Sequence, residues 1–274
     1  MYRLWKRALP SCLRRRLMIG WYDRLARLDA AADLPFLNHG YAPEPGTPPR
    51  PLDSSDEPNR YWIQLYDQLA AHAVWAGRDA LEVSSGHGGG VDWLARAYRP
   101  ATICGLDIAA GAVAHARARF ARPGVCFKQG DAQAMPFAAA AFDIVINVES
   151  SLNYPDFAAF LREADRVLKP GGHLLIADYR SRAKRAGFEG PLLALGYRML
   201  WQADLTAGVL RGHAATRDRK EALIRAHAPW PLRGLARRFA DLAEDGTASG
   251  QARFRDGRRV YLGYALMKPP AHRG

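Results

Sequence analysis

Strand-like and helix-like segments alternate along residues 78–180, and this alternation limits the fold more than any other feature. Apolar runs at 79–85, 101–108, 125–131, 142–150 and 173–179 indicate five strands, with helix-like spacing in most of the intervals. The run at 142–150 is nearly continuous in Phe, Ile and Val, as expected for a strand buried on both faces. The alternation predicts an α/β domain whose parallel sheet is covered by helices on both sides.

The segments before this region have other patterns. Residues 1–30 are basic and place apolar side chains at helical spacing, so we expect an amphipathic helix there. Residues 42–58 contain six prolines, which indicates a linker or lid loop. Residues 59–75 predict a helix, with Ser55 or Asp56 as its cap. We therefore divide the chain into an N-terminal helical cap, 1–75, and a ligand-binding domain, 76–274.

The C-terminal part shows two further patterns. Residues 181–240 are basic and rich in apolar side chains, and they predict a helical insertion within the 76–274 domain. Asp256-Gly257 stands between the runs 248–254 and 258–268, a setting typical of a β-hairpin. The three cysteines, Cys12, Cys104 and Cys126, show no metal-ligand spacing. We expect buried, reduced thiols and a cytoplasmic protein.

Four glycines within five positions follow the first strand, in the stretch LEVSSGHGGG. Glycine lets a ligand approach the backbone closely, and ligands of parallel sheets bind beyond the carboxyl ends of the strands. Acidic residues stand at matching positions: Glu82 inside the first strand, Asp107 at the end of the second and Asp131 at the end of the third. A carboxylate at Asp107 suits the two hydroxyls of a ribose. Asn147 and Glu149 end the fourth strand.

These residues together resemble the class I S-adenosylmethionine-dependent methyltransferases. LEVSSGHGGG is similar to the family's acidic, glycine-rich loop, LDI carries its ribose acid, GDAQAMPF resembles its adenine motif and RVLKPGGHLLIAD the segment before its fifth strand. Four stretches resemble a subgroup of bacterial methyltransferases that act on lipids and polyketides, such as the phthiotriolone dimycocerosate enzymes. They are FLNHGY (36–41), SSDEPNRYWIQLY (54–66), LEVSSGHGGG and INVESSLNYPDF (146–157). The resemblance implies a Rossmann-like seven-stranded sheet, mostly parallel with the last strand antiparallel, and an N-terminal helical lid.

The resemblance also implies a cofactor, S-adenosyl-L-methionine, and the residues that bind it. Glu82 would orient the glycine loop or the methionine amine, Asp107 would take the ribose, and Asp131 with Ala132 the adenine. The full set of implied contacts is Tyr61, Gln64, Glu82, Ser84, Gly86, Asp107, Ile108, Gly130, Asp131, Ala132, Asn147 and Val148. Ser84 departs from the family, which usually has glycine there, and it narrows the space beside the methionine.

Three residues are candidates for catalysis. Glu149 follows the fourth strand directly and would face the reactive methyl group, either as a general base or as a hydrogen-bond acceptor for the cofactor amine or a backbone N–H. His39 lies on the predicted lid, where it would reach the substrate. Tyr154 would line the acceptor pocket or stack on its own proline. The subgroup would have histidine where this chain has Leu152, which puts the subgroup's histidine-assisted chemistry in doubt.

The resemblance implies methyl transfer to a hydroxyl or carboxyl oxygen of a hydrophobic small molecule, with 1–60 and 181–240 on the acceptor side. One alternative is methylation of carbon or nitrogen in a quinone, sterol, terpenoid or alkaloid-like acceptor. Another is a non-catalytic partner protein that binds the cofactor. No cluster has metal-ligand spacing, so we expect a metal-independent enzyme.

The net charge is +12, from 39 Lys and Arg against 27 Asp and Glu. We interpret it as a solvated basic surface without a nucleic-acid partner, because no RNA- or DNA-binding module accompanies it. The alternative is peripheral membrane contact through the basic N-terminal helix. No apolar run approaches the ~20 residues that span a bilayer. The pattern indicates no oligomeric state.

Overall fold

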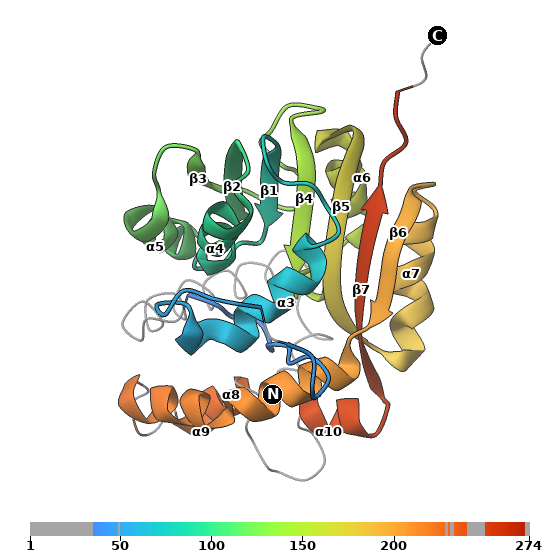
Figure 1. Cartoon of the computed structure of the whole chain (residues 1–274). Helices are drawn as coiled ribbons and strands as arrows, with labels where there is room; N and C mark the ends of the chain where they lie inside the picture. Colours follow the sequence, from blue (N-terminus) through green and yellow to red (C-terminus); the bar gives the residue numbers. More distant parts are fainter. Residues whose placement is uncertain (1–34, 49, 228–229, 231–232, 240–249, 272–274) are drawn as a thin grey trace.

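A computed structural model describes residues 35–48, 50–227, 230, 233–239 and 250–271 of the protein. Its centre is a seven-stranded sheet in the order β3-β2-β1-β4-β5-β7-β6 (Figure 1). The strands are β1 (Asp79–Val83), β2 (Thr102–Asp107), β3 (Val125–Gln129), β4 (Phe142–Val148), β5 (Leu168–Ser181), β6 (Arg198–Asp204) and β7 (Arg259–Met267). β7 runs antiparallel to β5 and β6, whereas β1 to β5 pair in parallel. The predicted Rossmann-like sheet, mostly parallel with its last strand antiparallel, is confirmed.

Helices cover both faces of this sheet (Figure 1). α3 (Arg60–Ala70), α4 (Gly89–Tyr98) and α5 (Ala110–Phe120) share one buried apolar cluster with the sheet. α6 (Phe157–Val167) and α7 (Arg185–Leu193) share a second cluster on the other face. α8 (Thr206–His227), α9 (Arg233–Phe239) and α10 (Gly250–Arg255) lie below the sheet, beyond the carboxyl ends of its parallel strands. Three short 3₁₀ turns complete these elements: η1 (Glu57–Asn59), η2 (Ser151–Asn153) and η3 (Arg182–Lys184).

The parallel register brings the predicted site residues to one edge of the sheet. β1, β2 and β4 run side by side in the same direction and end near the same level. Ser84, Asp107 and Glu149 therefore leave the sheet together, on the side that faces α8. Residues from distant parts of the chain meet there because the strand ends are neighbours.

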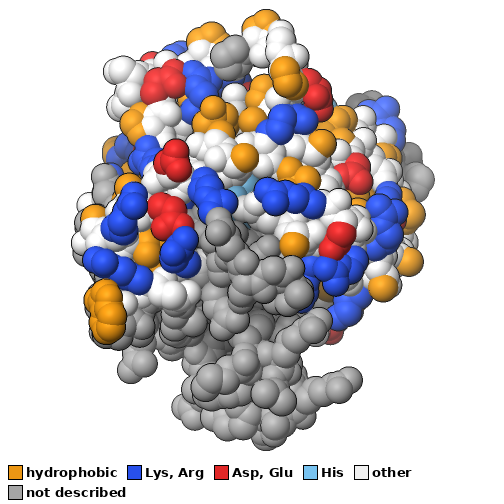
Figure 2. Space-filling model, turned by 90° about the horizontal axis from the view of Figure 1, so that it is seen from below, with side chains coloured by type: hydrophobic (Ala, Val, Ile, Leu, Met, Phe, Trp, Pro, Cys, Tyr) orange, Lys and Arg blue, Asp and Glu red, His pale blue; other side chains and the backbone are white. Residues whose placement is uncertain are grey.

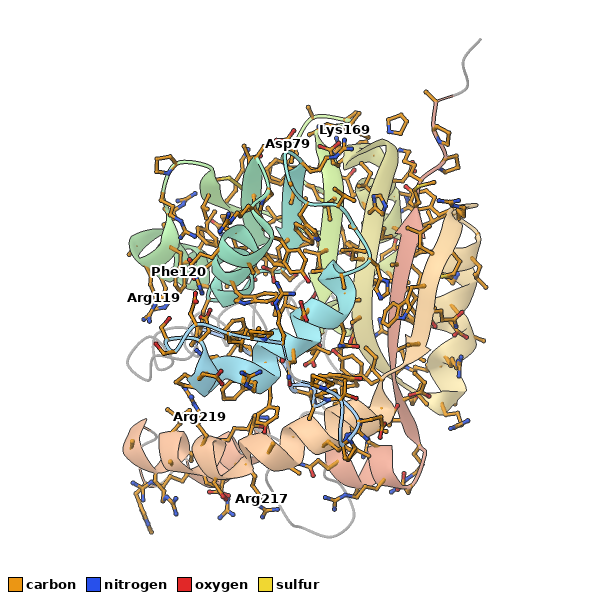
Figure 3. The ribbon with its side chains drawn as sticks, viewed as in Figure 1. Asp79, Arg119, Phe120, Lys169, Arg217 and Arg219 are labelled. Carbon is orange, nitrogen blue, oxygen red and sulfur yellow. A yellow bond between two sulfur atoms is a disulfide. The ribbon has the colours of Figure 1, made fainter. Side chains whose placement is uncertain are left out.

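The opposite edge of the sheet is held by an ion-pair cluster. Lys169 Nζ lies 2.9 Å from Asp79 Oδ2 and 2.8 Å from Asp143 Oδ2. Figure 3 shows Asp79 and Lys169 together at the top of the sheet, far from α8. The cluster joins the amino ends of β1 and β4 to the start of β5, and it leaves the carboxyl edge free for ligand binding.

The prediction that residues 181–240 are helical is wrong for 198–204, which form β6. This strand is the edge of the sheet and pairs with β7 in antiparallel register. Its residues alternate between exposed and half-buried, as expected for an edge strand with one covered face. Long-range pairing with β7 decides this conformation, and the local basic, mixed pattern did not reveal it.

The predicted hairpin at Asp256-Gly257 is also wrong. Residues 250–255 form α10, and the N–H of Asp256 donates to the carbonyl of Ala252 at 2.9 Å, in the helical pattern. Gly257 follows with a φ of 71°, a left-handed conformation that ends the helix before β7 begins. Because glycine supplies positive φ both in hairpin turns and at helix ends, the local signal does not distinguish them.

The helix predicted over 59–75 is confirmed as α3, which ends at Ala70. Asp56 does not cap it with its side chain. The Asp56 carboxylate is instead buried and accepts two hydrogen bonds, each 2.8 Å long, from the Arg96 guanidinium of α4. This ion pair ties the proline-rich loop to the sheet's helical layer. The amphipathic helix predicted within 1–30 lies outside the described residues.

Cys104 and Cys126 form a disulfide between β2 and β3. They stand opposite each other in the parallel ladder, with Cα atoms 4.5 Å apart, and Cys126 is exposed. The expectation of buried, reduced thiols is therefore wrong for this pair. Cys12 lies outside the described residues.

Candidate active site

A cavity of about 210 Å³ lies at the carboxyl edge of the sheet. Four of its walls follow strands: 84–87 after β1, 106–109 around the end of β2, 130–133 after β3 and 148–150 around the end of β4. Residues 35–38, Tyr66, Ala112 and residues 153–155 complete the lining. The cavity thus stands where four neighbouring strands end, the usual ligand position in an α/β sheet.

The glycines of the loop after β1 serve two purposes. Gly86 lines the cavity. A Cβ atom on Gly89 would lie 2.4 Å from a carbonyl oxygen of the 35–38 segment, and one on Gly90 would lie 2.4 Å from the ring of Tyr66. A Cβ on Gly88 would lie 2.8 Å from an aromatic ring of β3. Three of the four glycines therefore let protein segments pack closely around α4, and Gly86 gives space to a ligand.

Asp107 ends β2 with its carboxylate in the cavity wall. Its Oδ2 accepts a hydrogen bond from the N–H of Gly86 and its Oδ1 from the N–H of Ala109, both at 2.9 Å. Burial raises the pKa of Asp107, and the two backbone donors lower it only in part. Each carboxylate oxygen can accept a further hydrogen bond, so the side chain can bind ligand hydroxyls as well.

Glu82 lies behind the cavity wall and is 1% exposed. Its Oε1 accepts a hydrogen bond of 2.6 Å from the hydroxyl of Tyr66, which itself lines the cavity. Burial raises the pKa of Glu82 to about 8. The second oxygen, Oε2, has no hydrogen-bond partner among the described residues. A buried oxygen without a partner is unfavourable, so a donor from a bound ligand would stabilise it.

Tyr154 connects the glycine loop to the loop after β4. Its hydroxyl lies 2.7 Å from Ser84 Oγ and 3.0 Å from Ser150 Oγ, and it accepts a hydrogen bond of 2.8 Å from Asn147 Nδ2. Ser84 has a φ of 61°, the left-handed conformation that favours glycine. Burial raises the pKa of Tyr154, so its hydroxyl keeps its proton and acts within this network. Tyr154 also belongs to the lining of the cavity.

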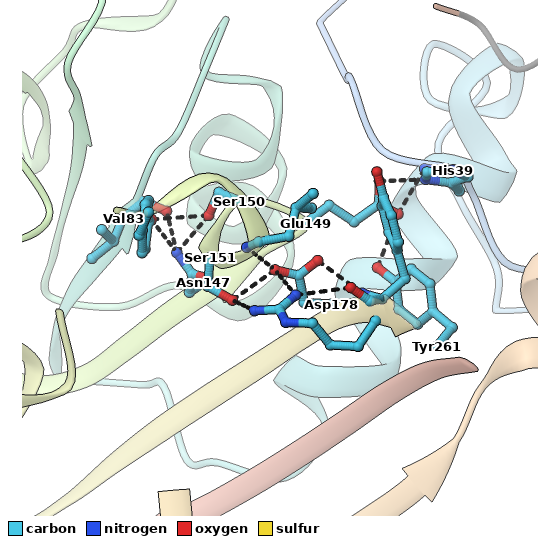
Figure 4. Close-up of polar contacts among 12 residues, drawn as sticks. His39, Val83, Asn147, Glu149, Ser150, Ser151, Asp178 and Tyr261 are labelled. Carbon is cyan, nitrogen blue, oxygen red and sulfur yellow. Dashed lines mark hydrogen bonds and ion pairs between the residues drawn. The ribbon is translucent and has the colours of Figure 1, made fainter. Parts of the chain in front are cut away.

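Glu149 joins the cavity to a second group of side chains, shown in Figure 4. Its Oε2 lies 2.6 Å from His39 Nδ1, and its Oε1 accepts hydrogen bonds from the His39 N–H at 2.8 Å and the Tyr261 hydroxyl at 2.9 Å. Burial, followed by the charge of Glu149, raises the pKa of Tyr261 well above its ordinary value. A proton on His39 Nδ1 makes a hydrogen bond to the Glu149 carboxylate. The lone pair of Nε2 is then available to accept a proton.

Asp178 fixes the loop that follows Glu149. It is fully buried, and its Oδ2 accepts hydrogen bonds from Ser151 Oγ at 2.6 Å and the Leu152 N–H at 2.8 Å. Arg180 Nη1 lies 3.0 Å from the same oxygen. Burial raises the pKa of Asp178, and Arg180 lowers it in part. Leu152, which replaces the histidine of the subgroup, is thus held through its backbone.

The fold brings most of the predicted site residues to the cavity. The lining contains Ser84, Gly86, Asp107, Ile108, Gly130, Asp131, Ala132, Val148, Glu149 and Tyr154. Glu82 and Asn147 lie behind the wall, and Tyr61 and Gln64 do not belong to the lining. Tyr66 of the same helix lines it instead, and sequence analysis missed this residue because it stands on the buried face of α3. His39 lies beyond Glu149 and is not part of the lining.

Comparisons with known proteins agree with this geometry. Residues 81–176 match the family described as a methyltransferase domain. The chain is 38% identical over 233 residues to the phthiotriol/phenolphthiotriol dimycocerosates methyltransferase of Mycobacterium tuberculosis, which spans 85% of this chain and 86% of that protein. The chain belongs to the S-adenosylmethionine-dependent methyltransferases. This methyltransferase is also 40% identical over 237 residues to the fatty-acid O-methyltransferase of Mycolicibacterium smegmatis, across 86% of this chain and 84% of that one.

A solved structure of the geranyl diphosphate C-methyltransferase of Streptomyces coelicolor A3(2) shares the fold. The two superpose with a TM-score of 0.65 at 20% sequence identity, over 95% of this chain and 99% of that chain. Within the part of this methyltransferase that the structure describes, no three His, Cys, Asp or Glu side chains are grouped so that they could hold a metal ion. No helix in the same part is long and apolar enough to cross a membrane.

Proposed function

We propose that this methyltransferase methylates a hydroxyl or carboxyl oxygen of a hydrophobic, lipid-like acceptor. The observation that carries the proposal is the His39–Glu149 pair, in which Glu149 lines the cavity and His39 lies directly beyond it. Relatives named for phthiotriol lipids and for fatty acids, at 38% and 40% identity, support a lipid-like acceptor. A paired histidine and carboxylate suit an oxygen acceptor, because a hydroxyl must lose its proton during methyl transfer.

The cavity residues fit S-adenosylmethionine, the methyl donor of this family. Asp107 would accept hydrogen bonds from the ribose hydroxyls, and Asp131 with Ala132 would contact the adenine, since all three line the same cavity. The unpartnered Oε2 of Glu82 favours a nearby N–H donor, as the methionine end would supply. When bound, the cofactor supplies a methyl group on a positively charged sulfur.

In the proposed reaction His39 is the proton acceptor and Glu149 orients it. Both oxygens of Glu149 already receive donors, from His39 and Tyr261, so this carboxylate is poorly placed to take a proton itself. His39 Nε2 would accept the hydroxyl proton as the oxygen attacks the methyl carbon. The His39 side chain is 17% exposed, which leaves the imidazole accessible to an acceptor.

The test combines a binding and an activity measurement. Titration of S-adenosylhomocysteine should show binding to the wild type and at least about tenfold weaker binding to Asp107→Ala, which loses hydrogen bonds to the ribose. With labelled S-adenosylmethionine and long-chain hydroxylated lipids, His39→Gln should lower kcat by about 10² to 10⁴ and leave S-adenosylhomocysteine binding unchanged. Equal turnover of wild type and His39→Gln, or methylation of carbon or nitrogen compounds alone, would contradict the proposal.

A further inference from the structure

A layer of aromatic rings lies beside His39, on the side away from the cofactor cavity. The rings of Tyr179 of β5, Phe254 of α10 and Tyr261 of β7 have their centroids 5.1, 5.9 and 6.4 Å from that of His39. His213 of α8 is 1% exposed, and its ring centroid lies 6.3 Å from that of His39. The proposed proton acceptor therefore stands at the edge of an apolar, aromatic surface.

One cation belongs to this layer. The guanidinium carbon of Arg259 lies 5.0 Å from the ring centroid of Tyr179 and 5.9 Å from that of Phe254. Because the Tyr179 ring is itself 5.1 Å from the His39 ring, the guanidinium is within about 10 Å of the imidazole. Arg259 precedes Tyr261 by two residues on β7, so both side chains leave the same face of the sheet.

The Arg259 guanidinium makes no hydrogen bond or ion pair with any residue that the structure describes, although the residue is half-buried. Its neighbours differ: Arg180 pairs with Asp178 at 3.0 Å, and Arg258 donates to Asp256 at 2.6 Å. The aromatic rings compensate part of the desolvation of Arg259. They do not satisfy its N–H groups, which form a fork that matches a carboxylate.

The nearest acidic groups of the fold are already occupied. Glu149 is hydrogen-bonded to His39 and Tyr261. Asp178 accepts a hydrogen bond from Ser151 and forms an ion pair with Arg180. No acidic side chain of the described residues lies within ion-pair distance of the Arg259 guanidinium, and a ligand can supply that anion. Figure 2 shows Lys and Arg side chains gathered over the face below the sheet, the same end of the molecule at which α8 and α10 lie. This surface would attract a negatively charged compound toward the site.

We propose that Arg259 binds a carboxylate of the acceptor, so that the preferred acceptor is an amphipathic hydroxy acid. This inference rests on the proposed function and adds the acceptor's charge to it. The hydroxyl lies at His39 and the carboxylate at Arg259, whose imidazole and guanidinium are within about 10 Å of each other. The hydroxyl oxygen forms a bond to the methyl carbon, the sulfur–carbon bond breaks to leave a neutral thioether, and the hydroxyl proton passes to His39. The carboxylate takes no part in the bond changes.

The experiment measures ligand binding to the enzyme saturated with S-adenosylhomocysteine, so it does not depend on turnover. The probes are 3-hydroxytetradecanoate and its primary amide, which differ only in the charge of the head group. Wild type should bind the acid at least about tenfold more tightly than the amide, as expected for a charge-assisted, two-point hydrogen bond. Arg259→Gln should lose this preference by weakening the acid and leaving the amide unchanged.

Two further variants make the result specific. Arg258→Gln removes the same charge from the adjacent, exposed position and should keep the preference for the acid. Arg259→Lys keeps the charge and the apolar stem of the side chain, and it should keep part of the preference for the acid. Equal losses for acid and amide in Arg259→Gln, or an acid preference that survives in it, would overturn the proposal. Absence of S-adenosylhomocysteine binding in wild type would instead overturn the proposed function.

Discussion

Replacement of the buried Glu82 by glutamine should stabilise the protein at neutral pH. In the unfolded chain this carboxyl loses its proton near pH 4.5, whereas in the folded protein it holds it up to about pH 8. Between these values the folded state binds more protons than the unfolded state, so the free energy of unfolding falls as pH rises. Each pH unit above about 4.5 lowers the free energy of unfolding by about 1.4 kcal/mol. At pH 7 the Glu82 carboxyl therefore destabilises the folded protein by roughly 3 kcal/mol.

Glutamine carries no charge, and its carbonyl can accept the hydrogen bond that the Tyr66 hydroxyl donates to Glu82. In urea unfolding followed by tryptophan fluorescence, we expect Glu82→Gln to exceed wild type by up to about 3 kcal/mol at pH 7. This advantage should shrink steadily toward about pH 5, because the carboxyl then begins to be protonated in the unfolded chain as well. The same variant should bind S-adenosylhomocysteine more weakly, because an amide NH₂ group, which cannot accept a hydrogen bond, replaces the unpartnered oxygen Oε2.

A matched control is Glu163→Gln. Arg166 holds the pKa of the Glu163 carboxyl below its usual value, so the group is ionised in both states over the same pH range. Its difference from wild type should therefore not change with pH. A Glu82→Gln variant that is no more stable than wild type at pH 7, or whose advantage is equally independent of pH, would refute the assignment of a buried, protonated carboxyl.

Two other predictions concern packing and a buried ion pair. Gly90→Ala would place a Cβ 2.4 Å from the Tyr66 ring and should cost about 1 to 3 kcal/mol in urea unfolding. Gly187→Ala, on α7 where nothing lies within 4 Å, should instead stabilise by about 0.5 to 1 kcal/mol. Similar effects of the two changes would contradict the packing role of Gly90. Asp178→Asn leaves Arg180 without its anion and should cost about 3 kcal/mol or more, so a loss under about 0.5 kcal/mol would disprove the role of that pair.

Local chemistry was sufficient to place the cofactor half of the site. Each of the acids Asp107 and Asp131 follows an apolar run, and the strand ends of a parallel sheet meet at one edge whatever the rest of the chain does. The strand–helix alternation likewise predicted the sheet and its layers. The sheet could be predicted because side-chain periodicity, turn glycines and strand direction depend on stretches of about ten residues.

Contacts between distant segments decided the rest, and no local pattern encodes them. β6 is a strand because β7 offers it hydrogen bonds, and Gly90 is small because the Tyr66 ring lies against it. The pairing of His39 with Glu149 joins residues 110 positions apart, although each had been singled out alone. Arg259 drew no attention in a chain with many arginines. Only the folded chain shows that Glu149 and Asp178 have their own partners and that this guanidinium, close to His39, has none among the residues that the structure describes.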